Sequence, residues 1–122
     1  MLLDTEQIIE WNPEVIFIDL AGYKLIKQDI QDNKKLFRSL RAFEKNRIYG
    51  VHPHNWYTTN YATVLANAWY IAKILYPERF HNIDPVKKAN EIYRMFLGKK
   101  VYHNLSEEFG KYENIEFSEF LE

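Results

Sequence analysis

A continuous apolar run at residues 15–18, Val-Ile-Phe-Ile, constrains the fold more than any other feature of the sequence. Its residues are β-branched or aromatic and do not alternate with polar ones, which predicts a strand buried on both faces, as in a parallel sheet. Between about Lys24 and Lys45 apolar residues recur every three or four positions, which predicts one or two amphipathic helices that break near Asp32-Asn33. A second strand is predicted at 47–51. The fold class is therefore α/β, built on a right-handed strand–helix–strand unit.

Capping signals predict further helices on both sides of this unit. A short helix starts after Asp4 and ends near Trp11, and a longer one spans 59–76 before Pro77. Asp84 and Pro85 open another helix, which continues to Gly98. In the 59–76 helix, one apolar stripe with many alanines is suited to pack against a sheet; it consists of Tyr61, Val64, Leu65, Ala68, Ala72 and Leu75. A last helix is predicted around Val101, Leu105 and Phe109, and no element is assigned to 112–122.

Two strands are too few for a stable sheet, so a further strand or a partner is expected to complete it. The 122 residues are 47% hydrophobic, which predicts one domain over 1–122 with a single core. A net charge of −1 from interspersed acids and bases predicts no nucleic-acid partner. No apolar run approaches the roughly 20 residues of a membrane span, and the first residues do not resemble a secretory signal.

Three segments together resemble one protein family. Residues 5–18 (TEQIIEWNPEVIFI) resemble the helix–Asn/Asp-Pro-Asp/Glu–strand segment of solute-binding proteins that serve ABC importers of iron-siderophores, haem and corrinoids. Residues 40–49 (LRAFEKNRIY) are similar to a second stretch of that family, except that Phe43 replaces a valine and no glycine separates Asn46 from Arg47. Residues 60–80 (NYATVLANAWYIAKILYPERF) are similar to a subgroup described as iron transport proteins.

The resemblance implies a C-terminal lobe of a two-lobe binding protein. Such a lobe is a Rossmann-like three-layer structure with a short, mostly parallel sheet flanked by helices, and ligand is held in the cleft between the two lobes. An N-terminal lobe or another copy would complete the sheet, so a homo-oligomer is expected when the chain is expressed alone. The resemblance also implies an extracytoplasmic parent protein, no resident cofactor, and an iron chelate, haem or a corrinoid as cargo.

The resemblance assigns Glu6 to permease docking, where a carboxylate at a helix start meets arginines of the membrane partner. The alternative is that an acid simply favours the positive end of a helix. Ligand contacts are expected in the turns after the strands, because open α/β sheets bind at the carboxyl ends of their strands. The candidates are Asp19, Tyr23, His52, His54, Asn55, Trp56, Tyr57 and Asn60. Alternatively, Trp56 and Tyr57 pack under the following helix, which Asn55 or Thr58 caps.

The sequence contains no nucleophile elbow, P-loop, dinucleotide-binding glycine motif or metalloprotease helix, and the chain is therefore predicted not to be an enzyme. The pair His52 and His54 could ligate a metal in a small hydrolase, but it lacks a spaced third ligand. A second hypothesis from another class is a stand-alone interaction domain, derived from such a lobe, that oligomerises through its incomplete sheet edge.

Overall fold

The computed structural model describes residues 5–56 and 58–118 of the chain, and the side chains of Thr5, Trp56 and Thr58 lie outside the description. The chain divides into two compact units. Unit 1 comprises Met1–Gly50 with Glu113–Glu122, and unit 2 comprises Val51–Tyr112. The expectation of one domain over 1–122 stays a prediction, since each unit is described by itself.

Unit 1 has the predicted alternation of helices and strands. Its elements are α1 (Thr5–Trp11), β1 (Ile16–Asp19), the short 3₁₀ helix η1 (Leu20–Gly22), α2 (Tyr23–Asp32), α3 (Lys34–Ser39), α4 (Arg41–Glu44) and β2 (Ile48–Val51), whose last residue begins unit 2. β1 and β2 form a two-stranded parallel sheet with flanking helices, which confirms the predicted α/β class. The helical stretch breaks at Asn33, as the sequence predicted. Asp4, the predicted cap of α1, lies outside the described residues.

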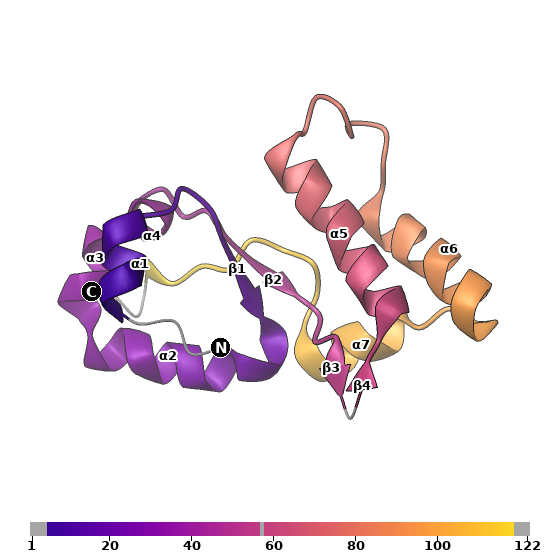
Figure 1. The fold of residues 1–122 in the computed structure, drawn as a ribbon, viewed down its shortest axis with the longest axis horizontal. Coiled ribbons are helices and arrows are strands. Elements are labelled where there is room, and N and C mark those ends of the chain that lie inside the picture. Colours follow the sequence, from indigo (N-terminus) through magenta and orange to yellow (C-terminus); the bar gives the residue numbers. More distant parts are fainter. Residues whose placement is uncertain (1–4, 57, 119–122) are drawn as a thin grey trace. The chain divides into compact units, whose positions relative to one another are not determined.

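A C-terminal segment, residues 113–118, returns to the free edge of β2 (Figure 1). Ile115 donates its N–H to the carbonyl of Ile48 at 2.8 Å, and Gly50 donates to the carbonyl of Glu113 at 3.3 Å. Tyr49 and Asn114 form an antiparallel bridge between these two hydrogen bonds. Part of what completes the sheet is therefore in the chain itself, in a segment to which the sequence analysis assigned no element.

The core of unit 1 is closed by Phe117 from this segment. Phe117 is 1% exposed, and its ring centroid lies 5.7 Å from that of Phe43 and 6.0 Å from that of Tyr23. The buried cluster consists of Ile18, Ile30, Leu40, Ala42, Phe43, Ile48 and Phe117. Residues of β1, β2, α2 and α4 thus share one core with the C-terminal segment.

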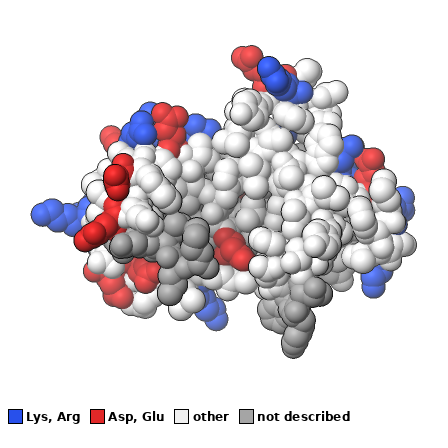
Figure 2. Space-filling model, viewed as in Figure 1, with Lys and Arg blue, Asp and Glu red and all other residues white. Residues whose placement is uncertain are grey.

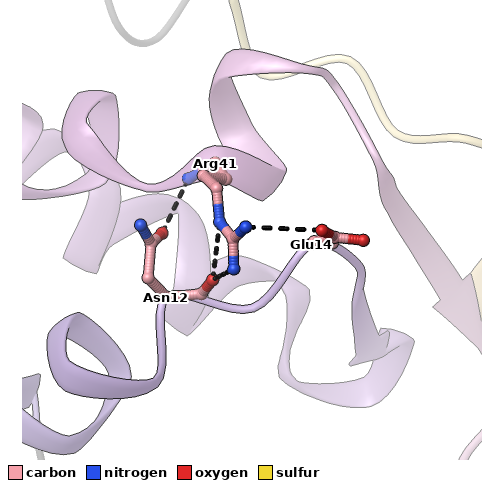
Figure 3. A network of polar contacts seen from close by, with 3 residues as sticks. All are labelled: Asn12, Glu14 and Arg41. Carbon is pink, nitrogen blue, oxygen red and sulfur yellow. Dashed lines mark hydrogen bonds and ion pairs between the residues drawn. The ribbon is translucent and has the colours of Figure 1, made fainter.

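A polar clamp joins two of the motifs that carry the family resemblance (Figure 3). Asn12 has a positive φ of 39°, and its side-chain oxygen accepts from the backbone N–H of Arg41 at 2.9 Å. The Arg41 guanidinium donates to the carbonyl of Asn12 at 3.0 and 2.7 Å, and lies 3.3 Å from the Glu14 carboxylate. The planar fork of arginine makes this set of bonds possible and fixes the loop before β1 against the start of α4.

The missing glycine between Asn46 and Arg47 has a conformational substitute. Asn46 itself lies in the left-handed region, with a φ of 53°. Asparagine tolerates this region better than most residues. Its side chain donates to Glu116 at 2.9 Å, while its carbonyl accepts from the Asn114 side chain at 2.8 Å. The turn into β2 is thereby also bonded to the C-terminal segment.

Unit 2 consists of a small hairpin and three helices. These are β3 (Asn55–Trp56) antiparallel to β4 (Thr58–Thr59), α5 (Tyr61–Leu75), α6 (Pro85–Leu97) and α7 (Tyr102–Phe109). The three helices confirm the predictions: Asp84 caps α6 by accepting from the N–H groups of Val86 and Lys87, and Gly98 ends it with a φ of 74°. The hairpin was not predicted, because its strands have only two residues each within what reads as a polar turn.

α5 packs on α6 through the face opposite to the predicted stripe. Its buried residues are Ala62, Thr63, Ala66, Asn67 and Tyr70, which meet Ala89, Ile92 and Tyr93 of α6 or lie close to them. In the predicted stripe, by contrast, Tyr61 is 71% and Leu65 42% exposed. The prediction that this stripe forms the packing face was wrong, because both faces of α5 are rich in alanine and periodicity alone does not rank them.

Acidic and basic side chains are interspersed on the face shown in Figure 2, where no broad patch of one sign is present. Within the described residues, no helix has both the length and the apolar character needed to cross a membrane.

The position of Phe117 gives a direct test of the C-terminal segment. Phe117→Ala removes a fully buried ring, and we expect a loss of about 3 kcal/mol in the free energy of unfolding. Leu25→Ala, at a residue that is 73% exposed, is the matched control and should change stability by less than about 0.5 kcal/mol. Urea unfolding followed by circular dichroism measures both. Equal, small effects would show that residues 113–118 do not belong to the core of unit 1.

Candidate functional site

Unit 2 contains a groove of about 630 Å³ between the start of α5, the end of α6 and α7. Most of its walls are apolar or aromatic. The lining residues are Pro53, Thr59, Asn60, Tyr61, Ala62, Thr63, Phe96, Leu97, Leu105, Glu108 and Phe109. Its volume lies within the range of pockets that hold small organic ligands.

The charge in this groove is negative. Among the lining residues that the structure describes, Glu108 is the one carboxylate, and none carries a positive charge. Side-chain polar groups come from Asn60, Thr59 and the Tyr61 phenol. The groove therefore favours a ligand that has aromatic or aliphatic groups and a neutral or positively charged polar group. Its described lining residues include no positively charged side chain that could bind a bare anion.

Four of the predicted ligand residues lie at or just before the N-terminal end of α5. Asn60 lines the groove and caps α5, where its side-chain oxygen accepts from the N–H of Thr63 at 3.3 Å. His54 and Asn55 are exposed; the carbonyl of His54 accepts from the N–H of Asn60 at 2.7 Å, and the Asn55 side chain accepts from the Thr59 hydroxyl at 3.3 Å. Trp56 lies in β3 with its side chain outside the description, and Tyr57 lies outside the described residues.

His52 is fully buried, so this geometry does not support a ligand contact for it. Its Nε2 lies 2.8 Å from the carbonyl of Gly110, and because a carbonyl only accepts, Nε2 carries the proton. Burial lowers the pKa of the His52 imidazole, against a smaller opposite effect of the bond to Gly110. The ring is therefore held neutral by its surroundings.

A polar and aromatic cluster surrounds this ring; the His52 cluster comprises His52, Asn67, Tyr102, Gly110 and Tyr112. Asn67 bonds both backbone groups of His52, donating to its carbonyl at 2.8 Å and accepting from its N–H at 3.3 Å. The Tyr112 hydroxyl donates to the same Asn67 oxygen at 2.7 Å. The His52 ring stacks on Tyr112 at 4.7 Å and lies 5.3 Å from Tyr102. No sequence pattern predicts this cluster, because its members come from four separated segments.

Asp19 and Tyr23 lie in unit 1, at the carboxyl end of β1 and the start of α2. Asp19 is exposed, and its carboxylate accepts from the N–H of Ala21 at 2.9 Å, which fixes the turn. Tyr23 is half-buried, with Lys27 at 5.4 Å from its ring. Asp19 thus lies where an open α/β sheet presents its ligand-binding turns. The remaining candidates lie in unit 2 and are described separately.

The histidine pair has no metal-binding geometry. His52 is buried and hydrogen-bonded, whereas His54 is exposed. In the described part of the chain, no group of three or more His, Cys, Asp or Glu side chains is placed to hold a metal ion. The metal-hydrolase hypothesis therefore has no support in the structure.

Glu6 lies in the first turn of α1 and is exposed. This is the position at which a carboxylate interacts favourably with the positive end of a helix, and it also leaves the group accessible to a partner.

The groove walls were missed by the sequence analysis. Leu105 and Phe109 were predicted to lie on the last helix, without a role in ligand binding. Phe96 is 54% exposed, so the periodic pattern placed it correctly on a helix but did not show that it faces the groove.

Comparison with curated proteins gives a match to the molybdate-binding protein MolA of Haemophilus influenzae. The two sequences are 29% identical over 94 residues, which cover 75% of this chain and 26% of MolA. The chain thus spans about a quarter of the length of this relative. No family model matches the sequence.

Proposed function

We propose that the chain acts in a solute-binding protein of an ABC importer, as the C-terminal lobe that holds one side of the ligand. The 94-residue similarity to a molybdate-binding protein carries this proposal. The parallel β1–β2 pair supports it, since Asp19 stands at the carboxyl end of the sheet, where such lobes bind. On this proposal the parent protein is extracytoplasmic and the chain works by binding rather than by bond-making.

The cargo that we propose is iron or another metal in the form of an organic chelate. Phe96, Leu105 and Phe109 offer apolar and aromatic surface to the organic part of a chelate. Glu108 at the same groove disfavours a bare oxyanion there, because like charges in a partly desolvated site repel. MolA binds molybdate, so the chelate is a proposal about this chain and not about its relative.

Delivery would use Glu6. Its exposed carboxylate can form a bidentate pair with a permease arginine, and closure of two lobes around a ligand would set the separation of two such contacts. Capture of ligand would in this way be coupled to docking on the permease.

Titration of the full chain with four solutes tests the cargo. Ferrioxamine B, haemin, cyanocobalamin and sodium molybdate are added in turn and followed by tryptophan fluorescence. We expect at least one of the three chelates to bind, and Phe96→Ala to weaken that binding about tenfold, since it removes roughly 1.4 kcal/mol of apolar contact.

Met95→Ala is the control, because Met95 is 74% exposed and does not line the groove. If molybdate binds and none of the three chelates does, the proposed solute-binding role stands, but the proposal of a chelate as cargo is refuted. If a chelate binds and its affinity falls equally in Phe96→Ala and Met95→Ala, the binding site does not lie in the groove. No binding of any of the four solutes would count against the proposal for this chain.

Docking is tested by reversing the charge of Glu6. In proteoliposomes that contain the cognate permease, Glu6→Lys should lower chelate uptake at least fivefold while chelate affinity stays unchanged, because a lysine repels the permease arginines. Glu10→Lys, one helical turn further along α1, is the control and should retain most of the uptake. Equal uptake by the two variants would exclude Glu6 as the docking residue.

A second candidate function is a stand-alone domain that oligomerises through a sheet edge. The observation that favours it is β1: among the described residues only β2 pairs with it, so its other edge is open to a partner strand. The C-terminal segment occupies the outer edge of β2 and leaves that of β1 unchanged.

Mass measurement over a concentration series tests this edge. If a second copy pairs with β1, we expect the weight-average mass from sedimentation equilibrium to rise from 14.8 kDa towards 29.6 kDa (2 × 14.8 kDa) between low and high micromolar chain. The N–H of Ile16 bonds the carbonyl of Arg47 at 3.1 Å, so the N–H of Phe17, the next residue of β1, faces the open edge. Phe17→Pro removes this N–H and should abolish the rise. A well-folded chain that stays monomeric at all concentrations would refute self-association.

A further inference from the structure

Both covalent connections between the units enter unit 2 at the His52 cluster. One connection is the Gly50–Val51 peptide and the other is the Tyr112–Glu113 peptide. His52 is the second residue of unit 2, and Tyr112 is its last. The two connecting segments are therefore held at unit 2 by residues that contact one another.

The contacts within the cluster join these two segments directly and through α5. The His52 Nε2–H bonds the carbonyl of Gly110 and its ring stacks on that of Tyr112, which are both direct links. Asn67 of α5 supplies the indirect link, because it bonds the backbone of His52 and the hydroxyl of Tyr112. All of these contacts lie within unit 2, and two of them depend on the His52 ring.

The chemistry of this ring makes the arrangement sensitive to protonation. Because Nε2 carries the proton, the neutral ring has its lone pair on Nδ1, and Nδ1 is buried without a hydrogen-bond partner in the described structure. A second proton would add both a positive charge and a new N–H donor at this atom. A buried donor without an acceptor is strongly unfavourable, and a buried unpaired charge more so.

The groups that face the ring offer no compensation. Tyr102 of α7 and Tyr112 contact it, Tyr70 of α5 stacks on Tyr112 at 4.4 Å, and Tyr93 of α6 lies nearby, bonded to Thr63 at 3.0 Å. Burial raises the pKa values of Tyr93 and Tyr112, so that both phenols are neutral in acid. No carboxylate of the described residues lies within ion-pair distance of His52.

We propose that the His52 cluster is an acid-sensitive anchor: neutral His52 holds the two connecting segments together at unit 2, and protonated His52 releases them. This anchor is independent of the proposed function. It consists only of contacts within unit 2, between residues 51–52, residues 110–112 and the helices that surround them.

The direction of the pH dependence follows from linkage. Burial lowers the pKa of His52 in the folded chain below its ordinary value, so the unfolded form binds the proton more readily. The anchor is then at full strength above the ordinary pKa of about 6.5 and weakens as the pH falls below it towards the lowered folded value.

Amide hydrogen exchange at pH 7.5 and 5.5, corrected for intrinsic rates, tests the anchor. We expect protection of the amides of residues 51, 52 and 110–112 to fall several-fold at the lower pH, with about tenfold as the limit for an ordinary pKa of about 6.5 in the released form. Ala66 and Ala89 in the α5–α6 core should change less than twofold. His52→Gln, which keeps a side-chain N–H donor but does not titrate, should abolish the difference. His103→Gln, at an exposed residue of α7, should behave like the unaltered chain.

Nitrogen-15 NMR of the imidazole rings decides the question if His52→Gln does not fold. In the unaltered chain, His52 should show the Nε2–H tautomer and a pKa below the ordinary histidine value. A pKa of His52 at or above that ordinary value, uniform loss of protection across unit 2, or a persistent pH effect in a folded His52→Gln chain would each overturn the proposal.

Discussion

The pairing of residues 113–118 with β2 is the interaction on which unit 1 depends. A parallel pair of four-residue strands is too small to be stable by itself, and the C-terminal segment adds backbone bonds on one side and Phe117 beneath. The same pairing brings the chain back to unit 1 beside the point where it left, since Gly50 bonds Glu113. The connection between the units is therefore double, and its two segments are bonded to each other in unit 1 and again in the His52 cluster.

The helices and strands could be predicted because their signals are local. Asp84, Pro85 and Gly98 define α6 by capping chemistry alone, and the apolar run of β1 needs no knowledge of its neighbours. The C-terminal segment could not be predicted in this way. Its apolar residues Ile115 and Phe117 are separated by Glu116 and lie between polar residues, and they form a strand-like edge only because β2, about 65 residues earlier in the chain, lies beside them.

In the candidate site, too, features set by local sequence could be predicted, and features set by contacts between distant segments could not. The position of Asp19 at the end of β1 could be predicted because the end of an apolar strand is a local feature, while its contact with a ligand stays a prediction. His52 looked like a ligand residue for the same reason, yet it is buried under Tyr102 and Tyr112, which arrive from distant segments. The groove beside Asn60 depends on which faces of α5, α6 and α7 meet. Because α5 is apolar on two faces, its packing face is decided by Tyr93 and Ala89 of α6 rather than by its own periodicity.

The Asn12–Arg41–Glu14 clamp makes narrow demands on the residues that form it. Asn12 needs a left-handed backbone, a side-chain acceptor and a carbonyl turned outward, while Arg41 must be long and forked enough to reach that carbonyl twice. These demands are met by few residue types, whereas groove residues such as Phe96 only need to be apolar. The clamp therefore tolerates fewer substitutions than the groove does. On the proposed function, a groove that carries Glu108 and aromatic walls suits an organic chelate of a metal better than a bare oxyanion.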